Sequence, residues 1–172
     1  MFRKATMADA AAIAAIYDEL HTAEEEGRAR IGWVRGVYPV RKTAEDAIQR
    51  GEMFVEEIDG QIVAAAKINQ TQEPAYAHAP WAHPAPEEEV MVLHTLVVSP
   101  RLKGAGYGTG FVAFYEQYAL DHGCKYLRMD TNEKNQAARS LYRKLGYTEV
   151  GVVPTVFNGI EGVQLVCLEK KL

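Results

Sequence analysis

The chain has 172 residues, is 48% hydrophobic and carries a formal net charge of −4. This length suits one globular domain across residues 1–172, with a core that buries about 70% of the unfolded surface. The acidic balance gives no overall attraction to nucleic acid or to an anionic membrane, so any phosphate recognition must come from a local site.

The N-terminal sequence and the cysteines indicate a cytoplasmic protein. The basic start MFRKATMADA is followed by a short apolar run that soon meets Asp18 and Glu19, so we expect no signal peptide and no membrane span. Cys124 and Cys167 lie in apolar contexts without CxxC spacing. They are predicted to be buried, reduced thiols.

The first half of the chain predicts a short strand, two helices and a hairpin. After a strand at Met1–Lys4, the Thr6–Asp9 capping signal opens a helix that we expect from about Met7 to His21. The segment Ile31–Val40, rich in Gly and aromatic residues, is predicted to be irregular and to form a lid, and is called the lid segment below. A short helix at 43–50 follows, and then a hairpin over residues 53–70 that turns at Asp59-Gly60.

The second half predicts strands and helices around one long loop. A proline-rich loop, residues 73–89, leads into the β-branched run Val90–Val98, a pattern typical of a central strand covered on both faces. We expect a helix from near Gly108 to His122, a strand at 125–131 and a helix at 133–147. Two last strands are predicted at 147–153 and 162–170.

Four glycines, Gly104, Gly106, Gly108 and Gly110, separate the central strand from the helix that follows it. Free backbone N–H groups at a helix start, together with the helix dipole, favour an anion, most simply a phosphate. The loop lacks the Lys-Ser/Thr ending of a Walker A motif. Its spacing also fails the dinucleotide pattern Gly-x-Gly-x-x-Gly, so both of these nucleotide sites are excluded.

Two motifs resemble those of one family. Val98-Ser99-Pro100 followed by Lys103-Gly104-Ala105-Gly106-Tyr107-Gly108 is similar to the pyrophosphate-binding segment of the GNAT (GCN5-related N-acetyltransferase) superfamily. Asn135-x-x-Ala138-x-x-Leu141-Tyr142-x-Lys144-x-Gly146-Tyr147 resembles the same superfamily's downstream signature. The resemblance covers about residues 91–147. Lys103 stands where the family prefers Gln or Arg, a change that keeps a cation but loses the planar fork of Arg.

The resemblance implies an α/β (α+β) fold with a mixed, mostly antiparallel sheet flanked by helices, in which the central strand splays from its neighbour. It also implies an acyltransferase that uses acetyl-CoA as co-substrate, without a metal, to acetylate the primary amine of a small molecule or peptide. A catalytically silent domain that binds or senses acyl-CoA remains the alternative.

The family's cofactor site maps onto two stretches. The backbone of Leu96, Val97 and Val98 would pair with the pantetheine arm, and an N–H near Leu96 or Val97 would stabilise the oxyanion. The pyrophosphate would bind the loop residues Lys103, Gly104, Ala105, Gly106, Tyr107, Gly108 and Thr109. Asn135 would hydrogen-bond the CoA arm, and it is also a candidate helix N-cap.

The catalytic assignments are Tyr142 as general acid and His94 as general base. The ordinary pKa of a tyrosine, about 10, lies above that of a thiol, so Tyr142 can protonate the leaving thiolate. His94 titrates in the range that a base needs at neutral pH. Glu88, Glu89 and Asp130 are weaker candidates for the base, and a water chain is a further alternative.

The acceptor would be selected by aromatic residues of the two loops: Trp33, Tyr38, Tyr76 and Trp81. These side chains could equally pack the loops onto the core. His78 and His83 lack further ligands at suitable spacing, so no metal site is expected. The protein is expected to be a monomer, or a homodimer paired through an exposed final strand.

Overall fold

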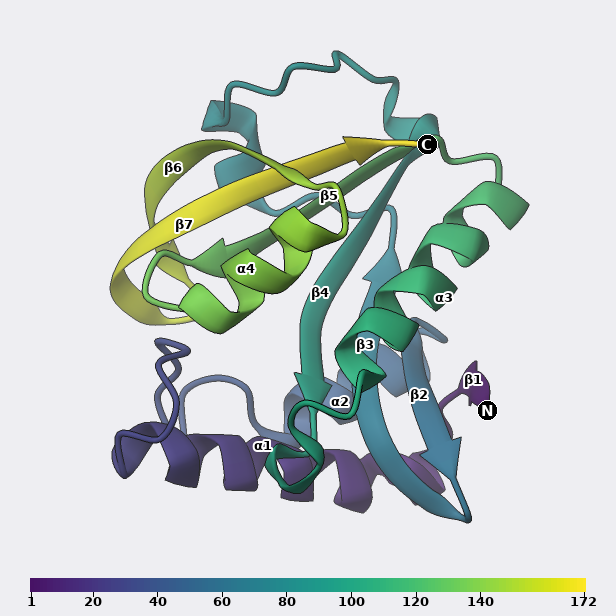
Figure 1. Cartoon of the computed structure of the whole chain (residues 1–172), viewed down its shortest axis with the longest axis vertical. Helices are drawn as coiled ribbons and strands as arrows, with labels where there is room; N and C mark the ends of the chain where they lie inside the picture. Colours follow the sequence, from purple (N-terminus) through teal and green to yellow (C-terminus); the bar gives the residue numbers. More distant parts are fainter.

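The computed structural model describes residues 1–172 and contains one seven-stranded sheet, ordered β1-β2-β3-β4-β5-β7-β6 (Figure 1). The strands are β1 (Phe2–Lys4), β2 (Met53–Ile58), β3 (Gln61–Asn69), β4 (Val90–Val98), β5 (Tyr126–Asn132), β6 (Thr148–Phe157) and β7 (Ile160–Lys171). Only β4 and β5 pair in parallel, and every other neighbouring pair is antiparallel. The mixed, mostly antiparallel sheet is therefore confirmed.

Four helices cover the two faces of this sheet. The helices are α1 (Ala10–Glu25), α2 (Arg41–Gln49), α3 (Tyr107–Asp121) and α4 (Gln136–Lys144). In the 3-10 turn Met7–Asp9 that leads into α1, Asp9 Oδ2 accepts a hydrogen bond from the Thr6 backbone N–H at 2.8 Å, the cap that the sequence predicted. The helix continues to Glu25, a turn beyond the predicted end at His21.

Alternation along β2 and β3 divides the core between the two helical layers. Phe54 and Ala66 pack into the cluster that contains α3, whereas Val55 and Ala65 pack into the cluster that contains α1 and α2. Successive side chains of a strand point to opposite faces, so both faces of these strands are buried. In a third cluster, Ala75 and Tyr76 of the proline-rich loop pack against residues of β4, β6 and β7.

Two tight hairpins fix the register of the outer strands. Asp59 and Gly60 have φ of +49° and +77°, which confirms the predicted turn between β2 and β3. Asn158 and Gly159 form a second turn of this kind, with φ of +48° and +85°, between β6 and β7. The last two strands are therefore longer than predicted, because they continue up to this two-residue turn.

The parallel pair β4–β5 separates partway along its length, as Figure 1 shows. Their pairing ends at Leu93 and Met129. Beyond that point β4 stays with β3, while β5 continues along β7 from Asp130 to Asn132. A bulge in the β3–β4 pairing includes Thr95, whose φ is +53°. The predicted splay of the central strand is confirmed.

The edge of the sheet differs from the prediction. The final strand β7 lies between β5 and β6, so it is not exposed, and the edge strand on that side is β6. The prediction was wrong because the β6–β7 hairpin docks onto β5 through its second strand. None of the helices has the length and apolar character that crossing a membrane requires.

Candidate active site

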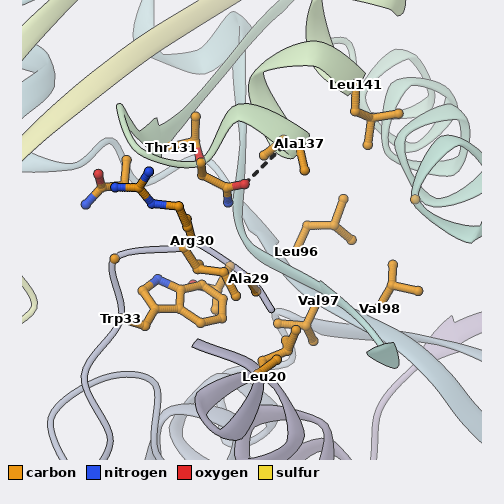
Figure 2. Close-up of a pocket in the computed structure, with 18 of the residues that line it drawn as sticks. Leu20, Ala29, Arg30, Trp33, Leu96, Val97, Val98, Thr131, Ala137 and Leu141 are labelled. Atoms are coloured by element: carbon orange, nitrogen blue, oxygen red, sulfur yellow. Dashed lines mark hydrogen bonds between the residues drawn. The ribbon is translucent and has the colours of Figure 1, made fainter. Parts of the chain in front are cut away.

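The opening between β4 and β5 leads into a cleft with a volume of about 1050 Å³. Figure 2 shows Trp33 on the lid segment, Leu96 and Val98 on β4, and Leu141 on α4 around this opening. The lining also includes the glycine loop, the start of α3, the end of β6, and residues of α1, β5 and β7. The cleft therefore combines segments from both halves of the chain.

The glycine loop presents free backbone donors to the cleft. The N–H groups of five residues donate no hydrogen bond within the chain: Gly104, Gly106, Tyr107, Gly108 and Thr109. They lie at the N-terminus of α3, where the helix dipole adds positive potential. This arrangement suits a bound anion such as a phosphate.

The glycines serve two different purposes. Gly104 and Gly106 have φ of +85° and +87°, and a Cβ on either would contact nothing, so the backbone conformation is what requires glycine there. A Cβ on Gly108 would lie 3.2 Å from Leu141 Cδ2, so that glycine permits the close approach of α4. Gly104 and Gly106 are thus required by the backbone of the loop, and Gly108 by the packing of the loop against α4.

The charge of the cleft is opposite to that of the whole chain. Its lining contains one acidic side chain, Asp130, and four cationic ones: Arg28, Arg30, Lys103 and Lys134. The chain as a whole carries −4. Arg28 is paired with Glu26, and the other three cations still outnumber Asp130, so the lining attracts an anion locally although the chain is acidic overall.

The splayed part of β4 offers further backbone groups. Ser99 N–H donates to Val63 O on β3 at 2.9 Å. Alternate residues of a strand direct their backbone groups to opposite neighbours, so the N–H groups of Leu96 and Val98 face the opening left by β5. An extended ligand can add there like a strand.

Asn135 and Tyr142 flank the cleft at the two ends of α4. Asn135 is the N-cap of the helix, since its Oδ1 accepts from Ala138 N–H at 3.1 Å, while its side-chain amide N–H groups have no partner in the chain. Tyr142 is 7% exposed, and its hydroxyl makes no hydrogen bond within the chain. Burial, followed by the negative charge of Asp130, raises the pKa of Tyr142 well above its ordinary value. The phenol is therefore neutral and able to donate.

Asp130 is the first residue of β5 beyond the pairing with β4. Its Oδ2 accepts a hydrogen bond of 2.6 Å from the Tyr76 hydroxyl. Burial raises the pKa of Asp130 to about 7, and the charge of Glu73 adds to the effect. This carboxyl group can gain or lose a proton near neutral pH.

His94 does not line the cleft. It is 5% exposed, and its Nδ1 and Nε2 lie 3.1 Å from Glu73 Oε1 and 2.8 Å from Asn69 Oδ1. Burial lowers the pKa of His94. Both ring nitrogens are thus engaged within the chain, outside the lining of the cleft.

Five other predicted site residues also lie outside the lining of the cleft. Ala105, Tyr76 and Trp81 do not line the cleft. Trp81 Nε1 donates to Tyr76 O at 2.8 Å, and the ring lies 4.3 Å from the Arg128 guanidinium, so these aromatics pack the proline-rich loop onto the sheet. Glu88 and Glu89, the weaker candidates for the base, are absent from the lining as well, whereas the third such candidate, Asp130, is part of it.

A wall of aromatic rings closes one side of the cleft. Tyr38 packs edge-to-face against Trp33 at 6.2 Å and against Phe157 at 5.6 Å, and all three residues line the cleft. The Tyr38 hydroxyl shares a hydrogen bond with Thr95 Oγ1. Phe157 was missed in the sequence, although the Asn158-Gly159 dipeptide marks the turn that carries it back to the site.

No group of three or more His, Cys, Asp or Glu side chains is placed to hold a metal ion. The remaining predicted residues all line the cleft: Trp33, Tyr38, Leu96, Val97, Val98, Lys103, Gly104, Gly106, Tyr107, Gly108, Thr109, Asn135 and Tyr142. The structure thus brings together two stretches, 96–109 and 135–142, that are separated in the sequence.

Comparisons with known proteins agree with this arrangement. The uncharacterized N-acetyltransferase YhfO of Bacillus subtilis is 34% identical over 62 residues, which cover 36% of this chain and 42% of that protein. An uncharacterized N-acetyltransferase of Methanocaldococcus jannaschii is 29% identical over 73 residues, covering 42% of this chain and 32% of the relative. The matched region is therefore less than half of either relative.

A GNAT-family acetyltransferase of Streptococcus agalactiae has the same fold, with a TM-score of 0.84 and 24% identity over 100% of this chain and 95% of that one. The sequence profile described as acetyltransferase (GNAT) family matches residues 13–147 of the chain, which includes both motifs and the whole glycine loop. On this match and this fold, the protein belongs to the GNAT family of acetyltransferases.

Proposed function

We propose that the protein transfers an acetyl group from acetyl-CoA to the primary amine of a small molecule. The observation that carries the proposal is the row of five unpartnered N–H groups at the start of α3, beside the splayed end of β4. The pyrophosphate of CoA would accept hydrogen bonds from these groups. The amides of its pantetheine arm would pair with the backbone of Leu96 and Val98.

This pose would bring the thioester to the point where β4 and β5 separate. The N–H of Leu96 would then stabilise the oxyanion that forms when an amine attacks the carbonyl carbon. Tyr142 would donate its hydroxyl proton to the departing thiolate. The raised pKa of Tyr142 supports this role, because the group stays protonated until the thiolate forms.

The acceptor would occupy the side of the cleft formed by Trp33, Tyr38 and Phe157. Aromatic faces attract an ammonium group by cation–π interaction, typically by about 0.5–2 kcal/mol. The lid segment itself supplies Trp33 and Tyr38 of this wall, and a wall closed by a lid favours a small amine over a protein terminus that needs an open groove.

The test measures binding and turnover separately. Calorimetry with acetyl-CoA and desulfo-CoA reports the cofactor site, and thiol release with a panel of amines reports transfer. We expect tight binding of both ligands, and turnover with at least one aromatic or aliphatic primary amine. Binding without turnover on the whole panel would instead assign the chain to a silent acyl-CoA sensor, and absence of binding would refute both functions.

A further inference from the structure

Asp130 occupies a position that the cofactor contacts leave unused. It is the first residue of β5 after the last pair with β4, Leu93 and Met129, and it is the one carboxylate in the lining of the cleft. Its half-buried side chain lies on the same lining as Tyr142 and the aromatic ring of Tyr38. An amine held against the aromatic wall would approach the thioester past this carboxyl group.

One oxygen of this carboxyl is held and the other is free. Asp130 Oδ2 accepts from the Tyr76 hydroxyl at 2.6 Å. Oδ1 accepts no hydrogen bond within the chain and is not enclosed by other atoms. Tyr76 is 2% exposed and packed between Trp81 and the sheet, so its hydroxyl is a fixed donor. The free oxygen can therefore accept a proton from a ligand in the cleft.

The charges around Asp130 come from several elements. Titratable groups from five segments interact with Asp130 and share in setting their pKa values. They are Lys67 on β3, Glu73 and Tyr76 of the proline-rich loop, Tyr38 of the lid segment, Tyr142 on α4 and Cys167 on β7. The carboxylate of Glu73, itself bound to His94, opposes ionisation of Asp130, and the ammonium of Lys67 favours it. Burial outweighs both, so the proton affinity of Asp130 is well above that of an exposed aspartate.

We propose that Asp130 is the general base that deprotonates the acceptor ammonium, and that Tyr76 is the positioning residue that holds its carboxylate in place. This inference rests on the proposed acetyl transfer. It assigns the base to β5 instead of to His94 on β4, whose ring lies outside the lining of the cleft.

The ammonium R–NH₃⁺ gives one proton to Asp130 Oδ1, and the lone pair of the resulting amine forms the C–N bond while the carbonyl π electrons move to oxygen. When the C=O bond re-forms, the C–S bond breaks and its electron pair leaves on sulfur, which takes the hydroxyl proton of Tyr142. The nitrogen then loses its second proton to the Tyr142 oxygen, and Asp130 releases the first proton to solvent. The products are the acetamide, CoA thiol and one proton.

A base of this kind changes the pH profile in a defined way. Without a base, only the free amine reacts, so kcat/KM rises with pH up to the pKa of the alkylamine, about 10. With Asp130 as base, the bound ammonium reacts, and kcat/KM rises tenfold per pH unit only up to the pKa of the carboxyl, about 7. The position of the plateau therefore separates the two mechanisms.

The first experiment follows the carboxyl itself in the protein without acetyl-CoA. Carbon-13 NMR of aspartate-labelled protein, with Asp130→Asn to assign the signal, should show an inflection for Asp130 near pH 7. Tyr76→Phe removes a donor to the carboxylate, so it should move the inflection to higher pH. An inflection below pH about 5 in the wild type would overturn the proposal.

The second experiment measures kcat/KM against pH for the same variants, using an amine found by thiol release. Asp130→Asn should lower kcat/KM at pH 7 by about 10²- to 10³-fold and move the plateau toward the pKa of the amine, with the Kd for acetyl-CoA within threefold of wild type. Tyr76→Phe should move the plateau upward in parallel with the NMR inflection, a shift that loss of packing alone would not cause. Asp121→Asn, at the exposed end of α3, is the matched control and should leave the profile unchanged.

The outcomes separate the two proposals. Turnover by Asp130→Asn within threefold of wild type at every pH overturns the role of Asp130 and leaves the acetyl transfer standing. If the plateau near pH 7 persists in Asp130→Asn and disappears in His94→Gln, the role of Asp130 is overturned and the base is His94. The proposed acetyl transfer stands in that case too. A wild type that binds acetyl-CoA and acetylates no amine overturns the proposed function, and the base with it.

Discussion

Gly106→Glu should abolish acetyl-CoA binding, and Gly123→Glu provides its matched control. Gly106 immediately precedes α3 in the glycine loop, and Gly123 lies just past the end of the same helix. Their φ values are +87° and +75°, and a Cβ on either residue contacts nothing. The two substitutions therefore impose a similar backbone strain of about 1–2 kcal/mol, and they differ in the end of the helix that receives the new carboxylate.

The magnitude follows from Coulomb's law. A glutamate at position 106 would lie about 5 Å from a pyrophosphate on the loop, where two unit charges repel by about 3 kcal/mol at an effective dielectric constant of about 20. The side chain also competes for the free N–H groups of the loop. A loss of 3 kcal/mol corresponds to more than about 100-fold in Kd.

Calorimetry with acetyl-CoA checks this expectation, and thermal unfolding checks the control. Both variants should melt lower, by about 2–4 °C for each kcal/mol of destabilisation, and Gly123→Glu should melt lower than Gly106→Glu because its carboxylate lies at the negative end of the helix dipole. Only Gly106→Glu should lose affinity. Equal affinity in the two variants, whether retained or lost, would refute a pyrophosphate on the loop. The glycines would then serve the fold alone.

Three further predictions test other parts of the structure. Tyr142→Phe should lower kcat by about 10²- to 10⁴-fold without changing the Kd for acetyl-CoA. Single-turnover thiol release measures the first quantity and calorimetry the second. An unchanged kcat would show that Tyr142 is not the general acid. Trp33→Ala should raise KM for the acceptor amine by about 2- to 30-fold, the equivalent of one cation–π contact, and a change confined to acetyl-CoA would contradict the aromatic wall. The Arg3 guanidinium holds the pKa of Asp9 at about 2, so Asp9→Asn should lower the free energy of unfolding by about 1–2 kcal/mol at pH 7. A carboxyl with a lowered pKa stabilises the fold fully only above its ordinary pKa. Urea titrations should therefore show the difference in free energy of unfolding between wild type and Asp9→Asn disappearing as the pH falls from about 4 to 2. A difference that persists at pH 2 would mean that the ion pair is not its cause.

Local features of the fold were predictable because their causes lie within a few residues. The strand Val90–Val98 was predicted with the bounds that the structure has, since a long β-branched run between turn signals has few other solutions. The cap at Thr6 and the Asp59-Gly60 turn were likewise found, because each depends on one or two side chains and their backbone angles. The glycine loop was identified in the same way, and its free N–H groups follow from its place before a helix.

The chemistry of the acceptor side was decided by contacts between distant segments. The hydrogen bond from Tyr76 to Asp130 spans 54 residues, and no local pattern links the two. Strand alternation placed His94 near the site in the sequence. In the structure the ring is engaged by Asn69 and Glu73, and only its neighbours Leu93 and Thr95 line the cleft. Phe157 reached the cleft only because the last hairpin is longer than its predicted strands.

The sequence by itself determined the family, the order of the elements and the loop suited to an anion, because motifs and turns report local backbone geometry. Tertiary structure decided which strand lies at the edge, where β4 and β5 separate, and the proton affinity of Asp130. These properties depend on burial and on the summed charges of neighbours from several elements, and such sums exist only once the chain has folded.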